Sequence, residues 1–156
     1  MTLFLGVDPG ISGALAVLDA DGALVDHLHM PIIQGGKRAR VNAAALAQFL
    51  AGFQGQRLTA YVERVGAMPG QGSASMFSFG HSAGVLEGVL AALEIPLELV
   101  VPAAWKRHHG LIGRPKDAAR ARAVHLYPAA PLHRKRDAGL ADAILIGRYG
   151  LERAGR

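Results

Sequence analysis

The sequence contains no cysteine among its 156 residues, so disulfide bonds, thiolate metal sites and cysteine nucleophiles are all excluded. No apolar run approaches the ~20 residues that a membrane-spanning helix needs. The amino terminus lacks the basic start and cleavage site of a secretory signal, and there is no internal repeat, low-complexity tract or long linker. We therefore expect a single domain over residues 1–156, located in the reducing cytoplasm and not bound to a membrane.

The positive charge is concentrated in the last third of the chain. Hydrophobic residues make up 51% of the sequence and charged residues 19%, which is typical of a folded domain with a core. Residues 1–103 hold five Lys and Arg against eight Asp and Glu, whereas residues 104–156 hold twelve against four. A basic segment on a slightly acidic remainder indicates a protein that binds a polyanion such as nucleic acid. The alternative is a basic solvated surface without a partner.

Apolar and alternating stretches predict five strands, with helix-forming stretches between and after the later ones. The strands are expected over residues 3–7, 13–18, 23–30, 58–63 and 97–101. The short spacing of the first three predicts an antiparallel meander. Helices are expected over residues 43–53, 78–93, 102–106, 116–126 and 140–153, with loops at 34–40 and 66–72. This order predicts an α/β fold in which helices flank a five-stranded mixed sheet.

Two of the predicted strands end in an acid. Asp8 follows the buried run Leu3–Val7, and Glu63 ends the strand at 58–63. A carboxylate at the end of a buried strand is costly unless a cation or hydrogen-bond donors compensate it. If the two strands are neighbours, both acids lie at one end of the sheet. For Asp8 the alternative is ordinary turn chemistry, because Pro9 and Gly10 follow it directly.

A third acidic region lies near the start of the last predicted helix. Asp142 is surrounded by apolar residues on a face that should pack against the sheet, and Asp137 fits the start of the same helix. Three or four carboxylates at one sheet end cannot all stay ionised without a cation. Two Mg²⁺ or Mn²⁺ ions would balance these charges and would suit phosphodiester cleavage.

These motifs resemble the RuvC-type Holliday-junction resolvases, in particular their phage and prophage-like branch, within the RNase H-like nuclease superfamily. The resemblance rests on Gly6-Val-Asp-Pro-Gly10, Val62-Glu63, Pro102-Ala-Ala-Trp-Lys106, Lys116 and Ala141-Asp142-Ala143. It implies an RNase H-like fold and a four-acid metal site, which Asp8, Glu63 and Asp142 match. The third acid of the family lies three or four residues before the last one, where this chain has Gly139 and Ala138, so Asp137 is the nearest candidate.

The resemblance also implies lysines beside the scissile phosphate, with Lys116 as the better match and Lys106 as the second. Contacts to DNA are expected from the basic residues Lys106, Arg107, Arg114, Lys116, Arg134 and Lys135. Gly66 stands where classical members carry an aromatic residue at the branch point. Phe77, Phe79 or Met68 would then take over stacking on a base. Packing in the core is the alternative for at least one of the two phenylalanines.

Glycines recur every fourth residue in the helix expected at 78–93, at Gly80, Gly84 and Gly88. Because glycine costs about 0.5–1 kcal/mol in a helix relative to alanine, such a stripe suggests close approach of another segment. The resemblance implies that this helix builds a homodimer. Packing of the stripe against the chain's own sheet is the alternative.

Together these features predict a homodimeric, Mg²⁺- or Mn²⁺-dependent endonuclease that resolves four-way DNA junctions by paired symmetric nicks. Two alternatives stay open. The same fold could act on other branched DNA or on RNA–DNA hybrids, or the protein could bind junctions without cleaving them. An actin- or hexokinase-like phosphotransferase is disfavoured, because it needs a second similar half.

Overall fold

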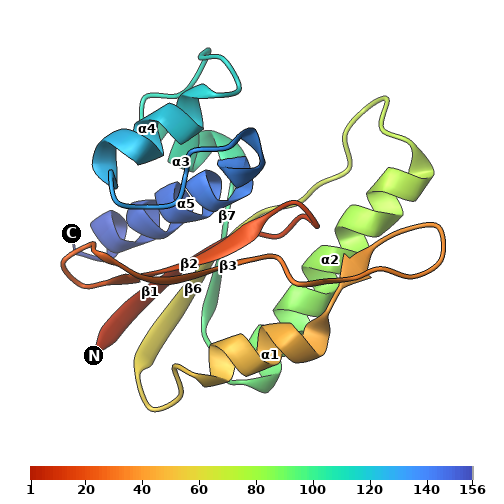
Figure 1. The fold of residues 1–156 in the computed structure, drawn as a ribbon, viewed down its shortest axis with the longest axis horizontal. Helices are drawn as coiled ribbons and strands as arrows, with labels where there is room; N and C mark the ends of the chain where they lie inside the picture. Colours follow the sequence, from red (N-terminus) through yellow and green to blue (C-terminus); the bar gives the residue numbers. More distant parts are fainter. Residues whose placement is uncertain (156) are drawn as a thin grey trace.

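A computed structural model describes residues 1–155, and its centre is a five-stranded mixed sheet (Figure 1). The strands are β1 (Thr2–Asp8), β2 (Ala14–Asp19), β3 (Leu24–His29), β6 (Arg57–Glu63) and β7 (Leu97–Val100). Their order is β3-β2-β1-β6-β7. Strands β1, β2 and β3 are antiparallel neighbours, whereas β1, β6 and β7 run parallel. The predicted five-stranded mixed sheet with its leading meander is confirmed.

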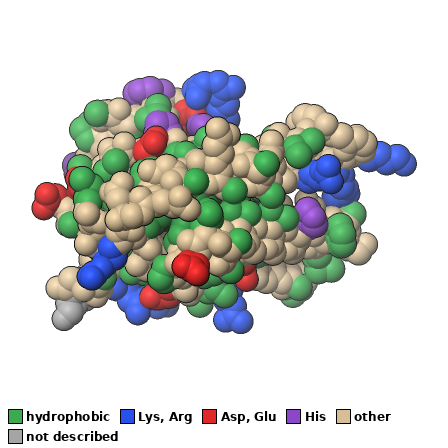
Figure 2. Space-filling view, turned by 90° about the horizontal axis from the view of Figure 1, so that it is seen from below, with side chains coloured by type: hydrophobic (Ala, Val, Ile, Leu, Met, Phe, Trp, Pro, Cys, Tyr) green, Lys and Arg blue, Asp and Glu red, His purple; other side chains and the backbone are tan. Residues whose placement is uncertain are grey.

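Helices cover both faces of this sheet. They are α1 (Ala43–Ala51), α2 (Ser73–Ala92), α3 (Pro102–His108), α4 (Ala118–Leu126) and α5 (Ala138–Ala154), with a 3₁₀ turn η1 (Lys135–Asp137) before α5. Helices α3, α4 and α5 lie on one face, and α1 and α2 lie on the other (Figure 1). The face that carries α1 has a largely uncharged surface, with Lys and Arg side chains toward its edges and ends (Figure 2). No helix within residues 1–155 has the length and apolar character needed to span a membrane.

Strand β1 is apolar at every position from Leu3 to Val7 because helices cover both of its faces. Phe4 packs in the core under α5, whereas Leu3, Leu5 and Val7 pack in the core under α1 and α2. This alternation follows from the two-residue period of a strand. The continuous apolar run therefore marks the centre of the sheet.

Helix α5 lies directly on β1 and β6 because glycines remove side chains at the contacts. A Cβ atom at Gly6 would lie 1.9 Å from the carbonyl oxygen of Ala143. A Cβ atom at Gly150 would lie 2.3 Å from the ring of Tyr61. Neither distance is sterically allowed, so these two glycines set how closely α5 approaches the sheet.

Two predicted elements have different bounds in the structure. Helix α2 begins at Ser73, five residues before the predicted start, and Gly72 precedes it as N-cap without a side-chain hydrogen bond. The loop at 34–40 is the tip of a hairpin whose strands are β4 (Ile32–Ile33) and β5 (Arg40–Val41). The serine-containing residues 73–77 gave no apolar period, so the start of α2 was predicted too late, whereas the predicted loop matches the hairpin tip except at Arg40.

Candidate active site

Asp8 and Glu63 end two adjacent parallel strands. Val7 of β1 is paired in register with Val62 of β6, so the acids that follow lie at the same edge of the sheet. The amide of Gly10 donates a hydrogen bond of 3.3 Å to Oδ1 of Asp8. Asp8 therefore stabilises the turn after β1 and also lies among the acids at the end of the sheet. The expected adjacency of the two strands is confirmed, and it brings together carboxylates that are 55 positions apart in the sequence.

Asp142 on α5 is electrostatically coupled to both acids. Burial is the main cause that raises the pKa of its carboxyl from 3.8 to about 7, and the negative charges of Asp8 and Glu63 contribute to the same rise. Burial likewise raises the pKa of Asp8 to about 6, with a smaller contribution from Glu63. Burial also raises the pKa of Glu63. The structure therefore assembles three desolvated carboxyls that repel one another when ionised.

Trp105 fixes the position of the Glu63 carboxylate. Its indole Nε1 donates a hydrogen bond of 2.6 Å to Oε2 of Glu63, and its ring is fully buried. A buried indole N–H needs an acceptor, and here the acceptor is a carboxylate of the site. The sequence analysis missed this role. The available signal was the tryptophan within the motif Pro102–Lys106.

Two lysines provide positive charge next to the acids. Lys106 interacts favourably with the carboxylates of Asp8, Glu63 and Asp142, whereas Lys116 acts on Asp142 alone. The Lys106 ammonium also lies 5.5 Å from the centre of the Trp105 ring. Helix α3 thus presents a donor to Glu63 and a cation to all three acids from consecutive residues.

The structure does not bring Asp137 into this group. Its carboxylate, which is 1% exposed, accepts hydrogen bonds from the backbone of Arg134 at 2.8 Å and from its guanidinium at 3.0 Å. His29 lies 3.8 Å away. The Arg134 hydrogen bond lowers the pKa of Asp137, in contrast to the raised values of the other three acids. Asp137 therefore anchors the turn that leads into α5.

The position three residues before Asp142 has no room for a side chain. A Cβ atom at Gly139 would lie 2.4 Å from the carbonyl oxygen of Ser12. The close contact between the start of α5 and the β1–β2 turn thus explains why this position carries no acid. Three carboxylates, not four, meet at the end of the sheet.

The three acids suit a hard divalent cation in their chemistry and their burial. Carboxylate oxygens are the ligands that Mg²⁺ and Mn²⁺ prefer, and a bound cation would reverse the raised pKa values. Within residues 1–155, no three His, Asp or Glu side chains are already arranged to hold a metal ion. Asp8, Glu63 and Asp142 would therefore have to turn toward a common ion in order to bind it.

The six predicted DNA-contacting cations are all exposed, and they follow one another through α3, the connection between α3 and α4, and the turn before α5. They are Lys106, Arg107, Arg114, Lys116, Arg134 and Lys135. Only Arg134 among them has a carboxylate partner, Asp137, within the described residues. The remaining five are free to contact phosphates.

Large apolar side chains line the approach to the acids. A shallow hollow contains Asp8 and Glu63 together with Met68 and Phe79. Phe79 is 43% exposed and Met68 is 68% exposed, while Phe77 is 75% exposed and stacks against His81. These fractions contradict the alternative that the side chains pack in the core.

The glycine stripe of α2 faces away from its own sheet. Gly80, Gly84 and Gly88 are exposed, and a Cβ atom added to any of them would meet nothing within 4 Å. The opposite face of the helix is buried through Ser82, Leu86 and Leu90. The alternative that the stripe packs inside the subunit is therefore wrong.

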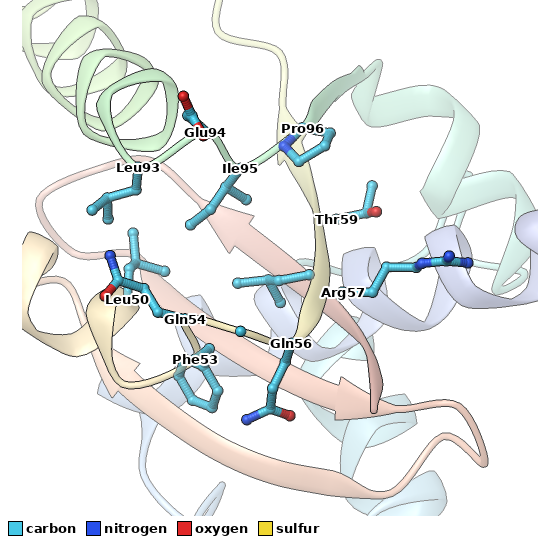
Figure 3. A pocket seen from close by; sticks show the side chains of 12 residues that line it. Leu50, Phe53, Gln54, Gln56, Arg57, Thr59, Leu93, Glu94, Ile95 and Pro96 are labelled. Carbon is cyan, nitrogen blue, oxygen red and sulfur yellow. The ribbon is translucent and has the colours of Figure 1, made fainter.

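A second hollow lies at the other end of β6 (Figure 3). The carboxyl end of α1, the start of β6 and the α2–β7 connection form it. Its walls combine apolar side chains such as Leu50 and Phe53 with polar ones such as Gln54, and Glu94 is the single carboxylate among the lining residues. The acids that can support chemistry lie at the opposite end of the strand.

Comparison with known proteins rests on structure alone, because no protein-family model and no curated protein matches the sequence. The fold matches the structure described as T. thermophilus RuvC in complex with Holliday junction substrate, with a TM-score of 0.71 and 17% identity over 99% of this chain and 97% of that one. The chain has the RuvC fold. A second Thermus thermophilus RuvC structure matches with a TM-score of 0.60, 16% identity and the same coverage. The predicted architecture of a five-stranded mixed sheet flanked by helices is thus confirmed, and it is that of the RuvC fold.

Proposed function

We propose that this protein is a metal-dependent DNA endonuclease that resolves four-way junctions by paired nicks. The observation that carries the proposal is the cluster of Asp8, Glu63 and Asp142, three half-buried carboxyls at one end of a sheet with the RuvC fold. One of the two RuvC structures contains a Holliday junction, which supports this choice of substrate. A protein that only binds junctions would not benefit from buried acids, because they repel DNA unless cations intervene.

Two Mg²⁺ or Mn²⁺ ions, when bound, would activate a water molecule and stabilise the leaving oxygen of the phosphodiester. Asp8, Glu63 and Asp142 supply the carboxylate oxygens that would hold them. Trp105 occupies Oε2 of Glu63 with its N–H, which leaves Oε1 as the available ligand. Lys116 and Lys106 stand beside Asp142, where an ammonium can neutralise the scissile phosphate or protonate the leaving oxygen.

The exposed cations of α3 and of its connection to α4 hold the DNA backbone next to the acids. Phe77 has the most exposed aromatic ring around the site, and it serves as the residue that stacks on an unpaired base at the branch point. Base stacking tolerates any sequence, so this contact selects the shape of the junction. Selection by shape fits a nuclease that reads DNA structure.

The open glycine face of α2 forms the homodimer interface in this proposal. Gly80, Gly84 and Gly88 allow a second copy of the helix to approach closely, and the exposed Met76 adds apolar area one turn before Gly80. A twofold axis through this contact would place two active sites symmetrically. Symmetric sites are what paired nicking requires.

A nicking assay on labelled DNA tests the proposal. Four-way junctions, three-way junctions, linear duplex and RNA–DNA hybrid are incubated with the protein in Mg²⁺, in Mn²⁺ and in chelator. We expect nicking of the four-way junction only with a divalent ion. Asp8→Asn and Glu63→Gln should each abolish it while leaving junction binding intact, because metal ligands are lost and phosphate contacts are kept.

Asp137→Asn is the matched control. It removes a carboxylate from the same region, but one that pairs with Arg134, so the variant should lose thermal stability and keep nicking. Near-normal nicking by the Asp8 or Glu63 variant would contradict the proposed mechanism. Stronger cleavage of RNA–DNA hybrid than of junctions would mean that the hybrid is the substrate, while the proposed metal-dependent cleavage would stand.

A further inference from the structure

The hairpin of residues 32–41 carries most of the positive charge in the first two-thirds of the chain. Lys37, Arg38 and Arg40 are three of the five Lys and Arg in residues 1–103, and all three are exposed. Between residues 27 and 86 the sequence has only one acid, the half-buried Glu63. The positive potential of the hairpin is therefore not cancelled by acids in the segments around it.

Contacts with α2 hold the hairpin beside the candidate active site. The Arg38 guanidinium donates a hydrogen bond of 3.0 Å to the carbonyl oxygen of Ala74 in the first turn of α2. One hollow is lined by Arg38, Ile11 and Phe79, and the hollow that contains Asp8 and Glu63 shares Phe79 with it. The surface is thus continuous from the hairpin across Phe79 to the acids.

Aromatic and cationic side chains occur together on this surface. Arg38 and Arg40 line a further hollow together with Phe77 and His81. Figure 2 shows Lys and Arg side chains gathered at the end of the molecule where the hairpin and α2 lie, with no Asp or Glu among them on the face shown. Guanidinium groups bind phosphate through two parallel hydrogen bonds, and aromatic rings stack on bases. This combination favours a nucleic acid over an acidic protein.

The hairpin and the basic surface of α3 and α4 lie on opposite sides of the sheet. The hairpin contacts α2, which covers one face, whereas α3 and α4 belong to the layer on the other face (Figure 1). The three acids at the end of the sheet lie between the two layers. A linear duplex on one basic surface would leave the other free, but a branched molecule can place a separate arm on each.

We propose that the hairpin of residues 32–41 binds the phosphate backbone of a second DNA arm, separate from the arm held by α3 and α4. This assignment rests on the proposed function for its substrate, since it concerns branched DNA at the same site. The two binding surfaces then give a preference for branched over linear DNA that one surface alone cannot supply.

The test measures binding of the full-length protein to a labelled four-way junction and to a linear duplex of equal size, in chelator and over a range of salt concentrations. The variant Lys37→Gln/Arg40→Gln removes two charges and keeps Arg38, which anchors the hairpin to α2. We expect its Kd for the junction to rise about tenfold, with a log–log salt slope smaller by about 2 because two phosphate contacts are lost. Its Kd for linear duplex should change less than about twofold, because that duplex is held by α3 and α4.

Two further variants control for folding and for net charge. Lys37→Arg/Arg40→Lys keeps both charges and should bind the junction as the unmodified protein does. Arg57→Gln/Arg153→Gln removes two exposed charges outside the hairpin and should leave the preference for junctions unchanged. An unchanged junction Kd for the first variant, or an equal loss on junction and linear duplex, would overturn the proposal.

Nicking by the unmodified protein separates this inference from the proposed function. If it nicks junctions but the hairpin variant binds them normally, the hairpin assignment alone is wrong. If the hairpin variant shows the selective loss of binding but the unmodified protein cleaves nothing in Mg²⁺ or Mn²⁺, the nuclease assignment alone is wrong.

Discussion

At the residue scale, Trp105 links the core of the molecule to its chemistry. The ring is fully buried, and its single polar atom, Nε1, donates a hydrogen bond to Glu63. Groups that hydrogen-bond a metal ligand set the ligand's orientation, and their loss typically weakens metal binding by 10- to 100-fold. Lys106, the next residue, lies over the same ring. Loss of the hydrogen bond from Trp105 to Glu63 should therefore weaken metal binding more than it lowers the stability of the fold.

Trp105→Phe should weaken Mn²⁺ binding by about 10-fold or more, because the ring stays while the donor to Glu63 is lost. Calorimetric titration with Mn²⁺ measures this directly, without reference to cleavage. The melting temperature in chelator should change little compared with that of Trp105→Ala, which also opens a cavity. Normal Mn²⁺ affinity in the phenylalanine variant would show that Trp105 has a packing role only.

The raised pKa values predict a pH dependence of stability. In the folded chain the carboxyls of Asp8 and Asp142 have pKa values of about 6 and about 7, against an ordinary value of 3.8. Between about pH 4 and pH 7 the folded state binds more protons than the unfolded one, so in chelator these groups make stability fall as pH rises. Thermal unfolding of the unmodified protein and of Asp142→Asn checks this, because the variant should lose part of that fall.

Mn²⁺ should counteract this fall of stability with rising pH, since it binds the ionised carboxylates. We expect it to raise the melting temperature more at about pH 8 than at about pH 5, where protons compete for the same oxygens. An equal shift at both pH values would mean that Mn²⁺ binds elsewhere.

The sequence indicated which acids lie at the candidate site, but not which side chains bind to them. Asp8 and Glu63 were predictable because each ends an apolar strand, and Asp142 because it interrupts an apolar helix face. Trp105 was not, because its partner lies 42 positions away and only the packed fold brings them together. Asp137 was placed correctly at a helix start, but its pairing with Arg134 could not be distinguished from metal binding without the structure.

At the element scale, the approach of α5 to β1 decides where Asp142 lies. Gly6 on β1 faces the backbone of α5 at Ala143, one residue after the acid. The elements themselves were largely predictable from apolar periodicity. The hairpin strands β4 and β5 were not, since each has only two residues and carries no period.

Gly6→Ala should destabilise the protein and slow nicking together, because the added methyl group meets backbone that cannot rotate away. Overpacking of this kind costs ~1–3 kcal/mol or more. Urea unfolding and the junction assay measure the two effects. Gly66→Ala is the matched control, since nothing lies within 4 Å of its added carbon. If Gly6→Ala were as stable as the control, α5 would not lie as close to β1 as described.

At the scale of the whole molecule, two surfaces stay uncovered in the single subunit. One is the glycine face of α2 and the other is the basic hairpin beside it. The sequence pointed to the first through the four-residue spacing of the glycines, although it could not tell an internal contact from an external one. It showed the charges of the hairpin but not their position, because the fold alone places them across the sheet from α3 and α4.

Gly84→Leu should convert a dimer to a monomer without loss of subunit stability, because the space around Gly84 is open within the subunit. Light scattering measures the mass, and a cruciform plasmid reports whether the two nicks stay paired. Gly84→Ala adds a single methyl group and should have a smaller effect on dimerisation. A leucine variant that remains dimeric and nicks in pairs would place the interface elsewhere.

The tight contact at Gly139 also limits how this site can evolve. Every glycine codon is one base away from a codon for aspartate or glutamate, so mutation regularly offers an acid at this position. The carbonyl oxygen of Ser12 leaves no space for it, and folding would eliminate each such variant before it could affect cleavage. A lineage that gains a fourth carboxylate would have to place it at the half-buried Ala138 or first move the β1–β2 turn. The three-acid arrangement is therefore protected against the simplest mutation that would change it.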